Sequence, residues 1–148
     1  MGENQATKTL VNELVAVLEE QIRVYRHLLE IVRKEKDILI AANLDDLNEN
    51  NRAKEAHLIK IRALESERLA KAQTLFLDLQ LQGEHPRLLE MARHLDAESA
   101  DKLRNIHSVM ELLLKRVQEY NKQNEALIQS AHRPRTLWRR RPSCPSPR

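Results

Sequence analysis

Turn-forming residues are nearly absent from most of this chain. Between Gln5 and Arg133 there is one glycine, Gly83, and one proline, Pro86. Aromatic residues make up only 3% of the chain, whereas charged residues make up 32%. β-Sandwiches and α/β domains need many more turn residues, so the composition excludes them and indicates long helices. With 148 residues, the chain has the length of one ordinary domain.

Cysteine and long apolar runs are also scarce. The single cysteine, Cys144, excludes an internal disulfide and a thiolate zinc site, and it is compatible with a reducing cytoplasm. No apolar run is long enough to cross a membrane, so we expect no membrane insertion. The first residues, MGENQATKTL, lack the apolar region of a secretory signal, and we expect none.

The motifs of enzymes and metal sites are missing as well. Six histidines are present, but none lies in a His-Glu-x-x-His or Glu-x-x-His pattern, which would place two metal ligands on one helix face. Glycine is too scarce for a phosphate-binding loop, and the serines lie in no nucleophile motif. We therefore expect a protein that is not an enzyme and that needs no metal and no cofactor.

The positive net charge of +3 comes from the end of the chain alone. Residues 133–148 contain six arginines and no acidic residue, and without them 19 basic residues stand against 22 acidic ones. A mildly acidic body lacks the basic face of a nucleic-acid-binding fold, so we expect no nucleic-acid partner. Weak phosphate contact by the arginines of the tail is an open alternative.

Most of the prolines also lie in this last segment. Four of the five, at positions 134, 142, 145 and 147, interrupt residues 133–148. Proline lacks the backbone donor that helices and sheets need, so we expect a disordered basic tail. The chain therefore divides into a helical body, residues 1–132, and a tail, residues 133–148.

Apolar residues at alternating spacings of three and four predict three long helices and a short one. The long helices cover about 7–42, 46–81 and 97–131, and the short one lies within 88–95. The first has two adjacent apolar rows, which suit contact with two partner helices. Only Lys36 breaks one row, and Gln21 and Glu35 break the other. Short connections then favour an all-α fold, an elongated antiparallel bundle.

Local signals mark the helix ends. Asn43 suits a left-handed cap of the first helix, and Asp45 suits the N-cap of the second. We expect Gly83 to end the second helix, Pro86 to open the short one, and Asp96 to cap the last. The predicted seam of the second helix begins with Leu44, Leu47, Asn51 and Lys54. Its first stretch, NENNRAKEAH, has few apolar residues, so the hairpin tip is expected to be solvated and mobile.

The last predicted helix carries apolar residues on more than one face. Such a surplus is typical of a partner-binding surface. The candidate residues are Ile106, Met110, Leu113, Leu114, Val117, Tyr120 and Leu127. Two alternatives stay open: these residues form the core of the bundle, or the first helix pairs with a second copy of the chain.

Residues 35–68 resemble FlgN-type flagellar export chaperones. The family shows Glu-x-x-x-Leu before the turn, and Glu35 and Leu39 match it. A lysine, leucines at helical spacing and Leu-Glu-x-x-Arg follow, matched here by Lys54, Leu58, Ile61, Leu64, Glu65 and Arg68. The last helix fits the family pattern at Leu103, Arg104, Ile106, Leu112 and Leu113. His107 and Met110 stand where the family has an asparagine pair.

The resemblance implies a cytoplasmic chaperone of hook–filament junction proteins, also called hook-associated proteins. Its last helix would cover the amphipathic C-terminal segment of the client, keep the client monomeric and deliver it to the flagellar export gate. Family members dock on that gate through a short aromatic segment, to which Thr136, Leu137 and Trp138 correspond; Trp replaces Tyr, and Arg139 replaces Gly. The competing interpretation is a homo-oligomeric helical scaffold or adaptor protein.

Overall fold

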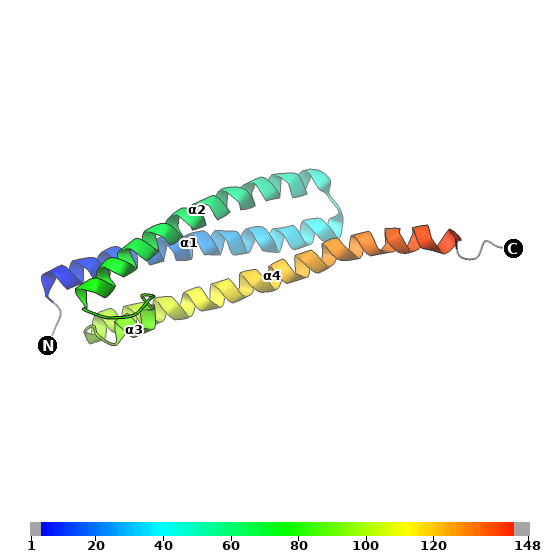
Figure 1. The fold of residues 1–148 in the computed structure, drawn as a ribbon. Helices are drawn as coiled ribbons and strands as arrows, with labels where there is room; N and C mark the ends of the chain where they lie inside the picture. The colour runs from blue at the N-terminus through cyan, green and yellow to red at the C-terminus, as the bar shows by residue number, and fades with distance from the viewer. Residues whose placement is uncertain (1–3, 144–148) are drawn as a thin grey trace.

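The computed structural model describes residues 4–143, with side chains from residue 4 to residue 131. This part of the chain holds four helices and no strand (Figure 1): α1 (Gln5–Ala41), α2 (Leu44–Asp78), α3 (Leu88–Ala92) and α4 (Ala97–Ser143). The predicted all-α class, with three long helices and one short one, is confirmed. Consecutive long helices run in opposite directions, so α4 runs parallel to α1 (Figure 1).

Helix α1 lies between α2 and α4 and contacts both (Figure 1). Its two adjacent apolar rows suit this position, because together they make a stripe wide enough to contact two neighbours. Gln21 bonds to Glu65 of α2, whereas the carbonyl of Val32 accepts a hydrogen bond from Asn124 of α4. The prediction that the first helix contacts two partner helices is therefore confirmed.

The larger of two apolar cores lies at the end of the molecule where α3 packs. This first core joins the start of α1, the end of α2, α3 and the start of α4. Its buried residues are Val11, Leu14, Val15, Leu18, Ala72, Leu75, Phe76, Met91, Ala92, Ala100, Leu103 and Ile106. At about 25 cal/mol per Å² of buried apolar surface, this core contributes most of the packing energy.

A second core, with fewer residues, fills the middle of the bundle. It consists of Leu28, Leu29, Val32, Leu113 and Val117, with Leu58, Ile61, Val109 and Tyr120 at its edge. Beyond it, toward the turn between α1 and α2, no further apolar core is found among the described side chains. Packing therefore weakens from the α3 end to the hairpin tip.

Helix ends differ from the predicted positions in the α1–α2 turn and in the α2–α3 connection. Ala42, not Asn43, takes the left-handed conformation after α1, with φ 56°. Asn43 instead caps α2, because its side chain accepts a hydrogen bond from the amide of Asp46 at 3.1 Å; the prediction for Asp45 was wrong. The predicted cap at Asp96 is confirmed by its bond to the amide of Ser99 at 2.9 Å.

Helix α2 ends five residues before Gly83, so that prediction was also wrong. Gln80 adopts a left-handed φ of 59°, and the amide of Leu81 donates to the carbonyl of Phe76 at 3.2 Å. This closing turn lets Leu79 and Leu81 pack against the first core, which favours the earlier stop. Pro86 lies before Arg87, the cap of α3, and not inside its first turn.

The hairpin tip is solvated, as its composition suggested. Leu44, predicted to lie on the apolar seam of the second helix, is 73% exposed. Asn51, also predicted on that seam, is exposed, and its neighbour Asn50 is buried instead. The side of α2 that faces α1 is therefore polar near the tip.

The helical backbone of α4 continues past the expected boundary at residue 132 and ends at Ser143. This extension projects beyond the turn between α1 and α2 (Figure 1). Proline does not forbid a helical backbone, but it removes a hydrogen bond, and a short helix without a packing partner is only marginally stable. The predicted disorder of the tail, residues 133–148, therefore stays a prediction. Residues 144–148 lie outside the described part of the chain.

Candidate functional site

The seven residues proposed for partner binding do not form one free surface. Ile106 belongs to the first core, and Leu113 and Val117 belong to the second, each with at most 9% of its surface exposed. Met110 and Tyr120 pack against the edges of these cores. Most of the predicted face of α4 is therefore already covered within the protein itself, chiefly by α1.

Two of the seven residues remain accessible. Leu114 is 37% exposed, and Leu127 is half-buried in an open groove between α1 and α4. This distal groove has a volume of about 260 Å³ and is lined by Lys36, Gln123, Ala126, Leu127 and Ser130. Leu112 and Ile128, at 56% and 43% exposure, add apolar surface to α4 outside the cores.

Residues 118–131 of α4, called distal α4 below, pack less tightly than the rest of the described helix. Asn124 is their only buried residue, at 2% exposure. Residues 100–117, by contrast, bury Ala100, Leu103, Ile106, Leu113 and Val117. Tyr120, at the start of distal α4, packs against the edge of the second core, but the apolar residues after it meet solvent and a groove.

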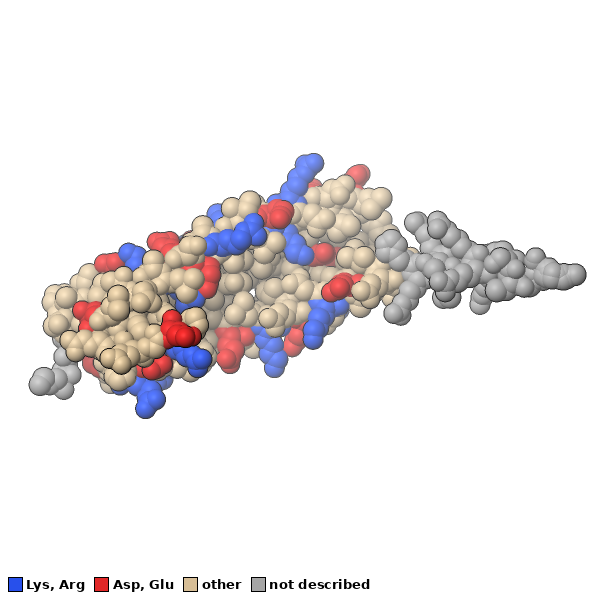
Figure 2. Space-filling view, in the orientation of Figure 1, with Lys and Arg blue, Asp and Glu red and all other residues tan. Residues whose placement is uncertain are grey.

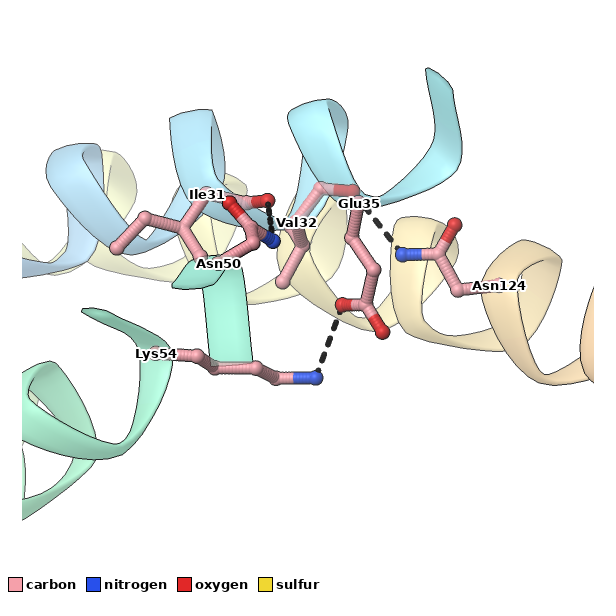
Figure 3. A network of polar contacts seen from close by, with 6 residues as sticks. All are labelled: Ile31, Val32, Glu35, Asn50, Lys54 and Asn124. Carbon is pink, nitrogen blue, oxygen red and sulfur yellow. Dashed lines mark hydrogen bonds and ion pairs between the residues drawn. The ribbon is translucent and has the colours of Figure 1, made fainter. Parts of the chain in front are cut away.

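Three helices meet in a polar layer next to the second core (Figure 3). Asn50 of α2 donates to the carbonyl of Ile31 at 3.1 Å, and Asn124 of α4 donates to the carbonyl of Val32 at 3.0 Å. Glu35 of α1 pairs with Lys54 of α2 at 3.1 Å. We use the name polar layer for Glu35, Asn50, Lys54, Asn124 and these two carbonyls. Its bonds attach both neighbouring helices to the same two turns of α1.

The ion pair in this layer is unequally shielded from solvent. The side chain of Glu35 is 7% exposed, whereas that of Lys54 is 26% exposed. A buried carboxylate loses its hydration and needs an opposite charge within a few ångströms, which the Lys54 ammonium supplies. The pair therefore fixes how α2 aligns with α1 at this level.

A second polar contact between α1 and α2 lies closer to the first core. Buried Gln21 donates to Glu65 at 3.0 Å, and Arg68 binds both oxygens of the same carboxylate at 2.6 and 2.9 Å. Hydrogen bonding from Arg68, with help from Gln21, lowers the pKa of Glu65. Burial, and then the Glu65 charge, raise the pKa of Tyr25 nearby.

Several of these contacts involve the residues that carry the family resemblance. Glu35 and Lys54 form the buried ion pair, and Glu65 and Arg68 form the bidentate one. Leu58 and Ile61 pack against the second core. The matching motif is thus a structural one, which aligns the α1–α2 hairpin.

Sequence reasoning missed the buried polar residues Gln21, Asn50 and Asn124. Gln21 was visible only as a break in an apolar row, and Asn124 lay at seam spacing in the last helix. A polar residue at a seam position is a known signal for a layer that fixes register. Asn50 gave no such signal, because the row predicted for α2 ran through Asn51.

Neither a cluster of metal-ligating side chains nor a membrane-spanning helix is found in the part of the chain that the structure describes. No three His, Cys, Asp or Glu residues gather there in a way that could hold a metal ion. His27 and His57 lie edge to face, with ring centroids 5.8 Å apart, but they lack a third ligand of these types. No helix among these residues is long and apolar enough to span a membrane.

Charges of both signs are interspersed on the molecular face shown in Figure 2. Lysines and arginines alternate there with acidic residues and form no continuous basic patch (Figure 2). On this face, therefore, no continuous basic track that could follow a phosphate backbone is seen (Figure 2). The side chains of Thr136, Leu137 and Trp138, predicted to dock on the export gate, lie outside the described residues.

Comparison with known proteins identifies a family to which the chain is similar. The model of the family described as FlgN protein matches residues 1–133. No curated protein and no solved structure matches the chain. The family match covers all the helices except the end of α4.

Proposed function

Because the chain belongs to the FlgN family, we propose that it is a cytoplasmic chaperone of hook–filament junction proteins. The family gives it the general role of a flagellar export chaperone. In the finer proposal, it binds the amphipathic C-terminal segment of its client and keeps the client monomeric. It then delivers the client to the export gate of the flagellar type III secretion system.

The observation that carries this proposal is the open distal groove. Leu127 lines it, and exposed Ile128 adjoins it on α4, so the apolar surface of the helix continues beyond the second core. An amphipathic helix laid along this surface would bury apolar area on both partners at about 25 cal/mol per Å², minus the cost of ordering. The small extent of the groove suits a client that must later be released.

The proposal is tested by mixing the full chain with the C-terminal segment of a hook–filament junction protein from the same genome. Size-exclusion chromatography with light scattering should give a 1:1 complex. An obligate oligomer that binds no such segment would contradict the proposal and would favour the scaffold alternative.

Variants with a new charge locate the binding surface. Leu127→Asp and Ile128→Asp should each weaken client binding by about tenfold or more, because a carboxylate would be desolvated in the interface. The matched control is Ile59→Asp on α2, where the side chain is 59% exposed outside both cores. Equal loss in the control variant would contradict a site on distal α4.

Substitutions in the covered part of α4 should act differently. Leu113 lies in the second core at 8% exposure, so Leu113→Asp should unfold the bundle instead of blocking a free surface. Met110→Asp should destabilise it to a smaller extent, since Met110 packs only partly against the first core. Circular dichroism separates these outcomes from a loss of client binding in a folded protein.

Docking on the export gate is proposed for Thr136, Leu137 and Trp138. Deleting residues 134–148 should leave client binding in solution unchanged but reduce export of the client and motility. A truncated strain with normal motility would contradict a docking role for this segment.

A further inference from the structure

We infer that distal α4 is a releasable arm, which opens from α1 at the polar layer to admit the client helix while residues 97–117 stay packed. This inference rests on the proposed function, since it names how the client site is regulated. The free protein covers part of its own binding surface, and binding uncovers it. Three observations support an opening at this level.

The first observation is the change in burial along α4. Five residues between 100 and 117 are buried in the two cores, but only Asn124 is buried between 118 and 131. Segments with few buried apolar contacts open at lower free energy than the rest of a protein. Opening distal α4 would therefore leave both cores nearly intact.

The second observation is the nature of the contact that holds distal α4. Asn124 donates to the carbonyl of Val32, but its own side-chain oxygen has no partner among the described residues. A buried acceptor without a partner is penalised, and it regains hydrogen bonds with water when the segment opens. The hydrogen bond from Asn124 to Val32 stabilises the closed arm, but the unpaired side-chain oxygen of Asn124 destabilises it. Opening of the arm removes this second, unfavourable contribution.

The third observation is what α1 presents beneath the arm. Lys36 lies with its ammonium 5.9 Å from the centre of the Tyr120 ring, and Lys36 also lines the distal groove. An amphipathic helix that enters between α1 and the arm would meet the Lys36 cation on one side and the apolar side chain of Leu127 on the other.

The α1–α2 hairpin does not depend on this arm. Glu35 and Lys54 bind each other, and Asn50 bonds to Ile31, without any group from α4. Opening of the arm therefore breaks neither of these contacts between α1 and α2, and the hairpin keeps its structure. Burial in the two cores keeps residues 97–117 in place and limits the change to distal α4.

A cross-link tests whether opening is required. Lys36→Cys and Gln123→Cys place thiols on opposite sides of the distal groove, and Cys144→Ser removes the native thiol. A short bis-maleimide would join α1 to distal α4. The matched control is the same variant with both thiols capped singly by N-ethylmaleimide. Joining should weaken binding of the client segment by about tenfold or more relative to the capped control.

Equal affinity of the joined and capped proteins would overturn the inference, although the proposed function would stand. If the wild-type chain itself binds no client segment, the proposed function fails instead. A second measurement needs no client and decides the inference alone. It is hydrogen exchange of the free full-length protein.

Amides of residues 121–131 should exchange about a hundredfold faster than those of residues 103–117, although α4 continues to Ser143. Asn124→Leu should slow exchange in residues 121–131 by about tenfold, because an apolar side chain removes the unpaired acceptor. Exchange in residues 103–117 should not change. Equal exchange in the two stretches, or no effect of Asn124→Leu, would overturn the inference.

Discussion

The two ends of the bundle are built from the same long helices but held together by different interactions. At the α3 end, twelve buried apolar residues from four helices form the first core. Toward the hairpin tip, a buried ion pair and two asparagine side chains take the place of apolar packing. Apolar packing supplies stability, whereas buried polar groups mainly fix alignment and open at lower cost. The α3 end therefore supplies most of the stability of the fold. The end near the hairpin tip, called the polar end below, is suited to exchanging partners.

The largest expected effect concerns the first core. Leu75→Ala should destabilise the protein by about 3 kcal/mol, because Leu75 is fully buried and the substitution leaves a cavity. The control Leu77→Ala, on the same helix at 63% exposure, should cost less than about 0.5 kcal/mol. Urea unfolding measures both, and similar values would contradict the assignment of the core.

The polar layer should respond in a different way. Lys54→Met should cost about 2–4 kcal/mol, since it leaves the buried Glu35 carboxylate without a counter-charge. The double variant Glu35→Leu with Lys54→Leu should recover most of that loss, because no buried charge remains. A double variant as unstable as Lys54→Met would show that the layer contributes net stability and not only alignment.

A smaller effect should appear in acid. Arg68 and Gln21 lower the pKa of Glu65, so the bound carboxylate stabilises the folded state above the unfolded value of 4.5. This stabilisation is lost as the pH falls through the lower pKa of the folded state. Glu65 is 47% exposed, so the contribution should be only about 0.5 kcal/mol. The Glu65→Gln variant lacks this carboxylate, so its free energy of unfolding should fall less than that of the wild type as the pH is lowered. Unfolding curves at several pH values measure the difference.

The sequence was sufficient to predict the elements and the central position of α1. Two adjacent apolar rows with few polar breaks leave a long helix few options, since both must be covered. The same rows could not distinguish residues that face the bundle from residues that face a partner. Leu113 and Leu114 are adjacent in sequence and similar in chemistry, yet one is in the second core and the other is exposed.

Turn positions and the polar layer were harder to predict. The end of α2 depended on Leu79 and Leu81 reaching the first core, a long-range contact that outweighed the local preference of Gly83. The bond from Asn124 to Val32 joins residues 92 positions apart, so only the folded chain reveals it. Local propensities specify helices, but tertiary contacts decide where they stop and which polar residues are buried.

Hydrogen exchange of the full chain, with and without the client segment, tests most directly whether the polar end is the one that receives a partner. The account predicts that the client changes exchange in residues 118–131 of α4 and in the facing residues 29–39 of α1. Exchange at the α3 end should stay the same. Changes confined to residues 97–117, or to the outer face of α2, would contradict it.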